Sequence, residues 1–382
     1  MPKGPKWLDL SHYVSREPVI LALLSGMAIL STLAVAGLSR MYNAQQDSLA
    51  NRWYSRGTAD LNAKQFHSAV NDFRTALLYS RDNFAYRLDL AEALTGENRV
   101  DEASAYLVNL WDRQPENGRV NLDLARIAAG KGEMQQALRY YHNAIYAVWP
   151  TGHEVERRNT RLELIHLLLR IDDKTQAQSE LIGLAANLGD NAAQHAQVAA
   201  LFLQAEDYEA GLAQYRLSLR VDRHNQAAMA GAGLAAFELG QYPLAERYLA
   251  QAVVNDPEDA ASRARLKTTE LVLAMDPFRR PVAVAERNRI VADDFAKAGE
   301  RLSACGASAN AAAPAGPQQS LMQPWIKLKP QITERGLRRN PDLANTAMDL
   351  VFAIERETSG ICGSLDDSDT ALLLIAKLHE GN

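Results

Sequence analysis

The first strong pattern along the chain is an uninterrupted apolar run near the N-terminus. No charged residue occurs between Pro18 and Ser39, and the polar side chains in this range are only Ser and Thr. About twenty helical residues span the ~30 Å hydrocarbon core of a bilayer. A buried core helix is rarely apolar on every face over such a length. The run therefore predicts a transmembrane anchor over residues 18–39, preceded by a tail over residues 1–17.

The residues around this run leave its orientation and its processing open. Cations lie on both sides of it, namely Lys3, Lys6, Arg16, Arg40, Arg52 and Arg56. Because the positive-inside count is nearly balanced, the short cationic tail favours a cytoplasmic N-terminus without fixing it. Ala34-Val35-Ala36 has the small-x-small form of a signal-peptidase site, with Ala36 at the cleavage position. The long polar region before the run and its continuation past Ala36 favour an uncleaved anchor, and either way the rest of the chain lies across the membrane.

A second pattern, of small and large residues, recurs between about residues 50 and 257. Small residues lie at positions 69, 103, 137, 177, 211 and 245, which are 34, 34, 40, 34 and 34 residues apart. Large residues follow them by four positions, namely Phe73, Leu107, Tyr141, Leu181, Tyr215 and Leu249. Small residues let two helices cross closely, and large ones at helical spacing fill the gap to the next helix. The period therefore predicts stacked antiparallel helix pairs, with Gly132 and Gly240 at turns.

This 34-residue period resembles the tetratricopeptide repeat (TPR). The residues that carry the resemblance are Trp53, Gly57, Ala69, Phe73 and Ala76 in the first repeat, and Gly233, Gly240, Tyr242, Ala245, Ala252 and Pro257 in the sixth. The resemblance implies an all-α fold, a right-handed α-solenoid of about six TPR helix pairs within residues 50–275. Because a terminal repeat needs a cover, residues 258–275 predict a capping helix. The six extra residues between the third and fourth repeats fall in residues 147–159 and predict a longer second helix or a protruding loop.

The resemblance also implies a concave face, formed by the first helix of each repeat, that binds other proteins. The positions that line it fall on Tyr54, Thr58, Leu88, Glu92, Arg119, Leu122, Arg126, His166, Leu203, Leu234 and Phe237. The N-terminal half of this set is mixed and polar, whereas the apolar C-terminal half suits an amphipathic helix of a partner or of this chain. Arg119 and Arg126 could fork onto a carboxylate, although a solvated face explains them as well. The carboxylate clamp of chaperone-binding TPR proteins is absent, because Tyr54 and Thr58 occupy its first-repeat positions.

The remaining sequence predicts a second helical region. Residues 276–320 are expected to form a helix from about Val284 to Leu302 and then an Ala/Gly/Pro-rich loop. Residues 321–382 are expected to form further helices, one from near Leu321, one after Pro341 and one near the C-terminus.

The two cysteines, Cys305 and Cys362, are too few for a four-ligand metal site. Outside the cytoplasm they could form a disulfide that closes a loop of about 58 residues and contributes roughly 4 kcal/mol. Two buried free thiols are the alternative.

Composition and charge narrow the function. The chain has 382 residues, 47% of them hydrophobic and 23% charged, which is ordinary for a protein of several packed parts. A net charge of −5 provides no global field for phosphate backbones, so no nucleic-acid partner is expected. The eight histidines lack zinc-protease spacing, and neither a phosphate-binding glycine loop nor a G-x-S-x-G elbow occurs. Adjacent carboxylates such as Asp293-Asp294 are expected on turns or exposed helix faces. We therefore expect no enzyme activity, no cofactor and no metal.

Together these patterns predict a membrane-anchored TPR scaffold or adaptor that binds other proteins. Its expected place is the inner membrane, with a single pass, contact to the bilayer through residues 18–39 and the repeats on the periplasmic side. The expected partner is a subunit of a bacterial envelope membrane complex or a helical peptide. A C-terminal redox or enzymatic domain regulated by the repeats, and an adaptor that faces the cytoplasm, are the alternatives.

Overall fold

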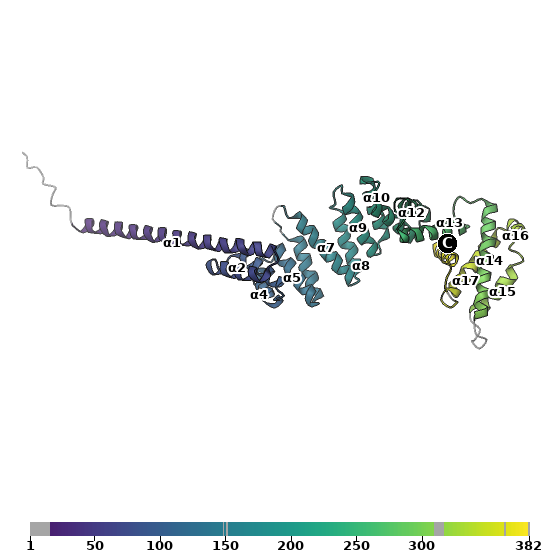
Figure 1. Ribbon diagram of the computed structural model, residues 1–382, viewed down its shortest axis with the longest axis horizontal. Coiled ribbons are helices and arrows are strands. Elements are labelled where there is room, and N and C mark those ends of the chain that lie inside the picture. The colour runs from purple at the N-terminus through teal and green to yellow at the C-terminus, as the bar shows by residue number, and fades with distance from the viewer. Residues whose placement is uncertain (1–15, 148, 150–151, 309–316, 363, 381–382) are drawn as a thin grey trace, which may run out of the picture. The chain divides into compact units, whose positions relative to one another are not determined.

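The architecture is helical throughout the residues that the computed structural model describes, which are 16–147, 149, 152–308, 317–362 and 364–380. Figure 1 shows helices α1 to α18, and these ranges contain no β-strand. The predicted all-α class and the predicted solenoid of helix pairs are thereby confirmed. The chain divides into two compact parts, residues 1–164 and 165–382, which we call the N-terminal body and the C-terminal body.

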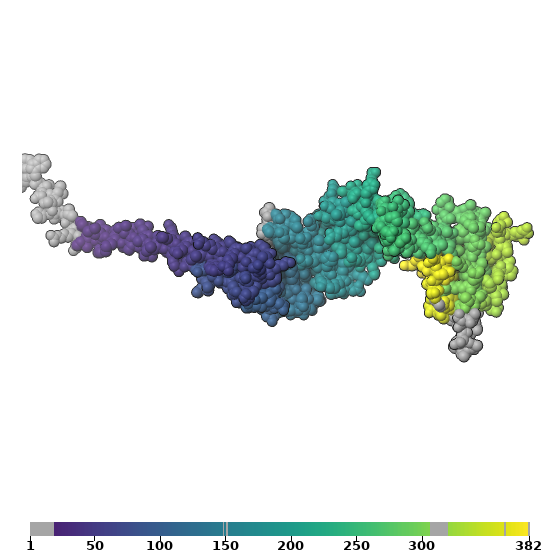
Figure 2. Space-filling view, in the orientation of Figure 1, coloured from purple at the N-terminus to yellow at the C-terminus, as the bar shows by residue number. Residues whose placement is uncertain are grey.

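The N-terminal helix α1 (Arg16–Asn62) continues without a break from the predicted anchor into the first repeat. The large apolar side chains from Val19 to Met41 are between 47% and 73% exposed, and Figure 2 shows this stretch as a bare rod. By length and composition α1 is a candidate membrane span, with a mean hydropathy of 2.4 over its most apolar window. The predicted anchor ends at residue 39 and the predicted solenoid begins at residue 50, whereas the structure joins them in one helix.

The second half of α1 is the first helix of repeat 1. Tyr54, Gly57 and Leu61 lie three and four residues apart, so they share one helical face. This face packs against α2 (Phe66–Tyr79), where the ring of the fully buried Phe73 lies over Gly57. A Cβ atom at Gly57 would come within 2.8 Å of that ring, so the close crossing requires glycine at this position.

Repeats 2 and 3 complete the N-terminal body. Their helices are α3 (Phe84–Gly96), α4 (Val100–Arg113), α5 (Gly118–Lys131) and α6 (Met134–Tyr146), and α7 (Glu154–Arg170) runs across the boundary between the bodies. The small residues that the period predicts at the crossings, Ala69, Ala103 and Ala137, are fully buried. Asn83 and Asn117 cap α3 and α5 by accepting hydrogen bonds from backbone N–H groups of the first turn. The observed register is therefore the one that the sequence period predicts.

The extra residues between repeats 3 and 4 form a connection rather than a longer second helix. Helix α6 ends at Tyr146 and α7 begins at Glu154, and residues 148, 150 and 151 lie outside the described part. Trp149 in this connection is half-buried, and its indole Nε1 donates a hydrogen bond to a backbone carbonyl of α6 at 2.7 Å. Its ring lies against Gly118, where a Cβ atom would approach within 2.5 Å. Trp149 therefore anchors the connection to repeat 3.

Repeats 4 to 6 and the capping helix form the first part of the C-terminal body. After α7 come α8 (Lys174–Ala185), α9 (Ala192–Gln204), α10 (Tyr208–Val221), α11 (Gln226–Glu238), α12 (Tyr242–Asn255) and α13 (Ala260–Met275). Close crossings again fall on glycine, since Gly233 meets Leu249 and Gly231 meets the ring of Tyr215. The predicted capping helix corresponds to α13, which packs against α12.

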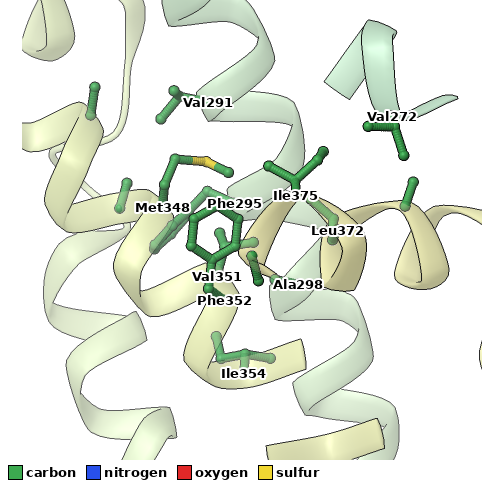
Figure 3. Close-up of a cluster of buried hydrophobic side chains, with 14 of the residues drawn as sticks. Val272, Val291, Phe295, Ala298, Met348, Val351, Phe352, Ile354, Leu372 and Ile375 are labelled. Atoms are coloured by element: carbon green, nitrogen blue, oxygen red, sulfur yellow. The ribbon is translucent and has the colours of Figure 1, made fainter. Parts of the chain in front are cut away.

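The C-terminal helices share one hydrophobic core with the end of the solenoid. They are α14 (Val284–Ser308), α15 (Pro317–Leu328), α16 (Glu334–Arg339), α17 (Asp342–Ser359) and α18 (Asp367–His379). Figure 3 shows part of this core, in which Phe295 of α14, Val351 of α17 and Ile375 of α18 pack together. Tyr242 of α12 and Val272 of α13 belong to the same cluster. The predicted boundary at residue 275 therefore does not separate two cores.

Two helix ends in this region differ from the prediction. Helix α14 continues to Ser308 rather than ending near Leu302, and α15 begins at Pro317 rather than near Leu321. The predicted loop is thereby reduced to residues 309–316, which lie outside the described part. Alanine is the strongest helix former, and the alanines that follow Leu302 continue α14.

Candidate functional site

The predicted concave-face residues of the N-terminal body lie on the first helices of repeats 1 to 3. They are Tyr54 and Thr58 on α1, Leu88 and Glu92 on α3, and Arg119, Leu122 and Arg126 on α5. Leu88 and Leu122 are buried and form the floor of this face, while Tyr54 and Thr58 are half-buried. The side chains of Glu92, Arg119 and Arg126 keep 44–49% of their surface exposed, so these three carry the accessible charge.

Tyr54 and Arg119 meet on the carboxylate of Asp89. The Tyr54 hydroxyl donates to Asp89 Oδ2 at 2.7 Å, and Arg119 Nη1 lies 2.8 Å from Asp89 Oδ1. Arg119 also forms an ion pair with Glu92, which lies on the same helix as Asp89. Burial, together with the hydrogen bond to Asp89, raises the pKa of Tyr54 to about 12, so its hydroxyl remains a donor. One carboxylate thus links the first helices of three successive repeats.

A second ion-pair cluster links α5 to α7. Arg126 forks onto Glu163, with Nε 2.9 Å from Oε2 and Nη2 2.6 Å from Oε1. Its Nη1 lies 3.4 Å from Asp123 Oδ1. Burial raises the pKa of Asp123 to about 7, and its Oδ2 accepts no hydrogen bond from the described residues. Asp123 is therefore a group on this face whose charge changes near neutral pH.

Three carboxylates of this face are absent from the sequence-based set, namely Asp89, Asp123 and Glu163. The sequence holds a signal for two of them, because Asp89 follows Tyr54 by 35 residues and Glu163 follows Arg126 by 37. Both separations are close to the repeat period, so these pairs occupy neighbouring positions in adjacent repeats. Asp123 lies three residues before Arg126 on one helix, a spacing that brings side chains together.

The two arginines are already paired within the chain. The sequence left open whether Arg119 and Arg126 bind a ligand carboxylate or lie on a solvated face, and in the structure carboxylates of the protein itself pair with both. The pairs Arg119–Glu92 and Arg126–Glu163 are exposed on both sides and contribute only ~0–1 kcal/mol each, so a ligand can exchange with a member of either pair. Four acidic side chains stand here against the two arginines, namely Asp89, Glu92, Asp123 and Glu163. Of the four, Glu92 and Glu163 are the accessible ones, so the face offers two carboxylates to a ligand with cationic or hydrogen-bond-donating side chains.

The predicted concave-face residues of the C-terminal body do not form one exposed apolar strip. His166 on α7 is exposed, whereas Leu203 on α9 and Leu234 on α11 are half-buried. Leu203 covers Gly211 of α10. The ring of Phe237 meets Tyr242 edge-on, with centroids 5.6 Å apart, and packs against the core that the C-terminal helices share. Packing within the chain thus covers part of this apolar surface.

Cys305 and Cys362 are joined as a disulfide in the structure, which ties the end of α14 to the turn after α17. Their Cα atoms are 5.2 Å apart, a usual separation for a protein disulfide. Arg301, one turn before Cys305, lies in a buried charge cluster, with Nη1 2.5 Å from Asp369 Oδ2 and Nε 3.4 Å from Glu355 Oε2. Burial, with Asp369 beside it, raises the pKa of Glu355 to about 7. The charges of this cluster hold α14, α17 and α18 together.

The described residues contain no candidate metal site, since no group of three or more His, Cys, Asp or Glu side chains is placed to hold an ion.

The prediction that Asp293 and Asp294 both lie exposed is wrong for Asp294. Asp293 is solvated, but Asp294 points into the protein and is buried. Adjacent residues of a helix face directions about 100° apart, so one of the pair can be solvated while the other is not.

A comparison with protein families decides which repeat the helix pairs represent. The family model of the tetratricopeptide repeat matches residues 54–108, 96–152 and 199–260. The chain contains tetratricopeptide repeats. The matched TPR ranges include Tyr54, Arg119 and Arg126, so the ion-paired face described above is built on TPR helices. No curated protein sequence matches the chain.

Several solved structures resemble this TPR protein. YrrB, described as a TPR protein with an unusual peptide-binding site, has 14% identity and a TM-score of 0.40, over 50% of this chain and 95% of that chain. The Pseudomonas aeruginosa protein pilF has 15% identity and a TM-score of 0.40, over 57% and 97%. The C-terminal part of a TPR repeat-containing protein from Cytophaga hutchinsonii has 9% identity and a TM-score of 0.43, over 81% and 97%.

Proposed function

We propose that this TPR protein is a membrane-anchored scaffold without catalytic activity, which docks other proteins through the concave face of its repeats. It passes the inner membrane once, with the repeats on the periplasmic side, and serves as a subunit or assembly factor of an envelope complex. The observation that carries this proposal is the apolar, exposed first half of α1, which continues directly into repeat 1.

The exposed half of α1 needs an apolar environment. Large side chains such as Leu23 and Leu30 are exposed, and none of the most apolar window is buried. Each such side chain forgoes about 1.5–3 kcal/mol relative to burial. Soluble proteins rarely expose contiguous apolar patches above a few hundred Å². A bilayer would cover this surface, which supports the role of α1 as an anchor.

The ion-paired face of the N-terminal body is the proposed docking surface for a partner segment. Its charges are exposed at Glu92, Arg119 and Arg126, and its carboxyl groups outnumber its arginines. A basic or amide-rich segment can replace the arginine at Glu92 or at Glu163 with little loss of stability, because both of these ion pairs are exposed. Tethering confines both proteins to the membrane and raises their effective concentration, so that modest affinity suffices.

The paired cysteines support the proposed side of the membrane. Disulfides persist in oxidising compartments such as the periplasm and are rare in the cytosol. The Cys305–Cys362 bond would be stable on the periplasmic side of a single-pass anchor. The bond joins α14 to the turn after α17, and these helices pack on the end of the repeats. The disulfide and the docking face therefore lie on the same side of the membrane.

The docking proposal is tested by co-purification with the full chain from detergent-solubilised native membranes, followed by quantitative mass spectrometry. The variant R126E/E163R exchanges the charges of one pair on the concave face and retains an ion pair between α5 and α7. We expect the amount of specific partner to fall at least about tenfold, because the ligand meets reversed charges. The unfolding midpoint measured by circular dichroism should fall only modestly, because the exchange keeps the pair between α5 and α7 but removes the contact of Arg126 with Asp123.

A matched control exchanges the charges of another pair in the same body. Lys131 Nζ lies 2.8 Å from Asp101, at the ends of α5 and α4 and outside the set of concave-face residues. The D101K/K131D variant should retain the partner. Equal enrichment with both exchanged variants would exclude the concave face as the docking surface. If no protein is enriched above a chain that carries the anchor alone, the scaffold function itself is refuted.

A further inference from the structure

A surface hollow lies between α10 and α12, the second helices of repeats 5 and 6, and does not include the concave-face residues. It has a volume of about 910 Å³ and is lined by residues of α10, α12 and the connection between α10 and α11, with Met229 of α11 at its base. Leu219 and Tyr248 are half-buried in its walls, and Val254 is exposed at its edge. The hollow therefore combines an apolar lining with an open mouth.

The basic side chains of this hollow are four arginines and one histidine. Arg216, Arg220, Arg223 and Arg247 line it together with His224, and each of the five is exposed. No Asp or Glu is among the lining residues, and none of the four arginines forms an ion pair within the described part of the chain. In a protein with a net charge of −5, this is a local concentration of positive charge with no carboxylate among the lining residues.

The arrangement of the arginines follows from the repeat. Arg216, Arg220 and Arg223 are four and three residues apart on and just after α10, so they lie along one edge of the hollow. Arg247 of α12 belongs to the opposite wall. The side chain of Gln226 donates a hydrogen bond to the Ala252 carbonyl at 2.9 Å and thereby ties α11 to α12 beneath the hollow. Helix α11 packs against both α10 and α12, so this packing fixes the spacing of the two walls.

We propose that this hollow, which we call the arginine groove, binds an acidic amphipathic segment of another protein. Arginine forks match carboxylates, and the apolar lining matches the aliphatic residues beside them in such a segment. The headgroups of an intact bilayer would meet only the exposed arginines, whereas a protein segment can contact the arginines and the apolar lining together, which favours the protein segment. Residues 309–316, between α14 and α15, lie outside the described part of the chain. They contain no Asp or Glu, so they do not supply the acidic segment.

The arginine groove is tested with the full chain in nanodiscs of zwitterionic lipid. The probe is a fluorescent helical peptide with glutamates four and three residues apart and leucines between them, and its counterpart carries glutamines instead. At low ionic strength the glutamate peptide should bind at least about tenfold tighter by fluorescence anisotropy, and added salt should remove the difference. The R220E/R247E variant should lose this preference.

A matched control reverses two exposed arginines of α16, in the variant R335E/R339E, which changes the net charge equally and should leave peptide binding intact. R220Q/R247Q replaces R220E/R247E if circular dichroism shows that the latter is misfolded. The concave-face variant R126E/E163R should bind the peptide normally, which separates this site from the proposed docking face. Equal binding of the two peptides, or equal weakening by the groove and control variants, would overturn the proposal. Displacement of the peptide by monomeric short-chain phosphatidylglycerol would instead assign the groove to lipid headgroups.

Discussion

Asp294, in the middle of α14, is a carboxyl group buried among the C-terminal helices. It is 3% exposed, and its Oδ2 accepts no hydrogen bond from the described residues. Burial, and then the neighbouring Asp293, raise its pKa to about 8 from an ordinary value of 3.8. Because the pKa is higher in the folded state, the unfolded chain releases this proton first as the pH rises. The free energy of unfolding should therefore fall between about pH 4 and pH 8.

Asp294→Asn should reduce this pH dependence. Asparagine cannot ionise, so the cost of a buried charge at pH 8 disappears, while the side chain keeps its shape. One pKa unit corresponds to about 1.4 kcal/mol, and we expect a gain of at least about 1 kcal/mol at pH 8 and a clearly smaller gain at pH 5. Urea unfolding followed by circular dichroism measures this. Asp293→Asn, at the exposed neighbour, is the control and should reduce the pH dependence much less than Asp294→Asn does, because burial is the larger cause of the raised pKa of Asp294. Equal destabilisation by Asp294→Asn at both pH values would show that the carboxylate is ionised and paired.

The same residue marks a limit of sequence reasoning. The adjacent Asp293 and Asp294 look alike in sequence, and only the packing of other helices around α14 decides that one is buried. The partners of Arg119 and Arg126 could have been predicted, because opposite charges about one repeat apart occupy neighbouring positions. The arginine groove could also have been anticipated, since Arg216, Arg220 and Arg223 have helical spacing. The lack of carboxylates around these arginines depends on contacts between helices that the sequence does not reveal.

At the scale of the helices, the repeat period predicted α2 to α13 because each pair depends on local spacing of small and large residues. The continuity of α1 was not predicted, because the residues between Arg40 and Ala50 carry no apolar pattern of their own, although they also contain no helix breaker. The shared core of α12 to α18 was also missed. Its members lie far apart in sequence, as Tyr242 and Ile375 do, so no local periodicity connects them.

The close crossing of α1 and α2 can be tested with Gly57→Ala. Alanine would add helix propensity, but its Cβ atom would lie 2.8 Å from the ring of the buried Phe73, which has no room to move. We expect the free energy of unfolding to fall by roughly 1–3 kcal/mol.

Gly130→Ala in α5 is the matched control, because a Cβ atom there would meet nothing within 4 Å. It should stabilise the protein by about 0.5–1 kcal/mol, the usual advantage of alanine over glycine in a helix. Comparison of urea midpoints tests both, and a Gly57→Ala variant as stable as Gly130→Ala would contradict the crossing.

At the scale of the whole molecule, α1 has 47 residues and would extend about 70 Å at 1.5 Å per residue. A bilayer would take up about 30 Å of this length. The remainder includes the first helix of repeat 1, so the proposed anchor would join the N-terminal body through continuous helix rather than through a flexible linker. A partner docked on this body would then be held at a defined distance from the membrane.

The central claim is that α1 crosses the membrane and places the repeats on its far side, and thiol labelling tests it most directly. Spheroplasts of a bacterial host that expresses the full chain are treated with a membrane-impermeant maleimide, before and after reduction. The account predicts that the protein stays with the membranes and that Cys362, the more exposed of the two cysteines, is labelled only after reduction, without lysis. A soluble protein, or thiols that react only after lysis and without a reductant, would contradict it.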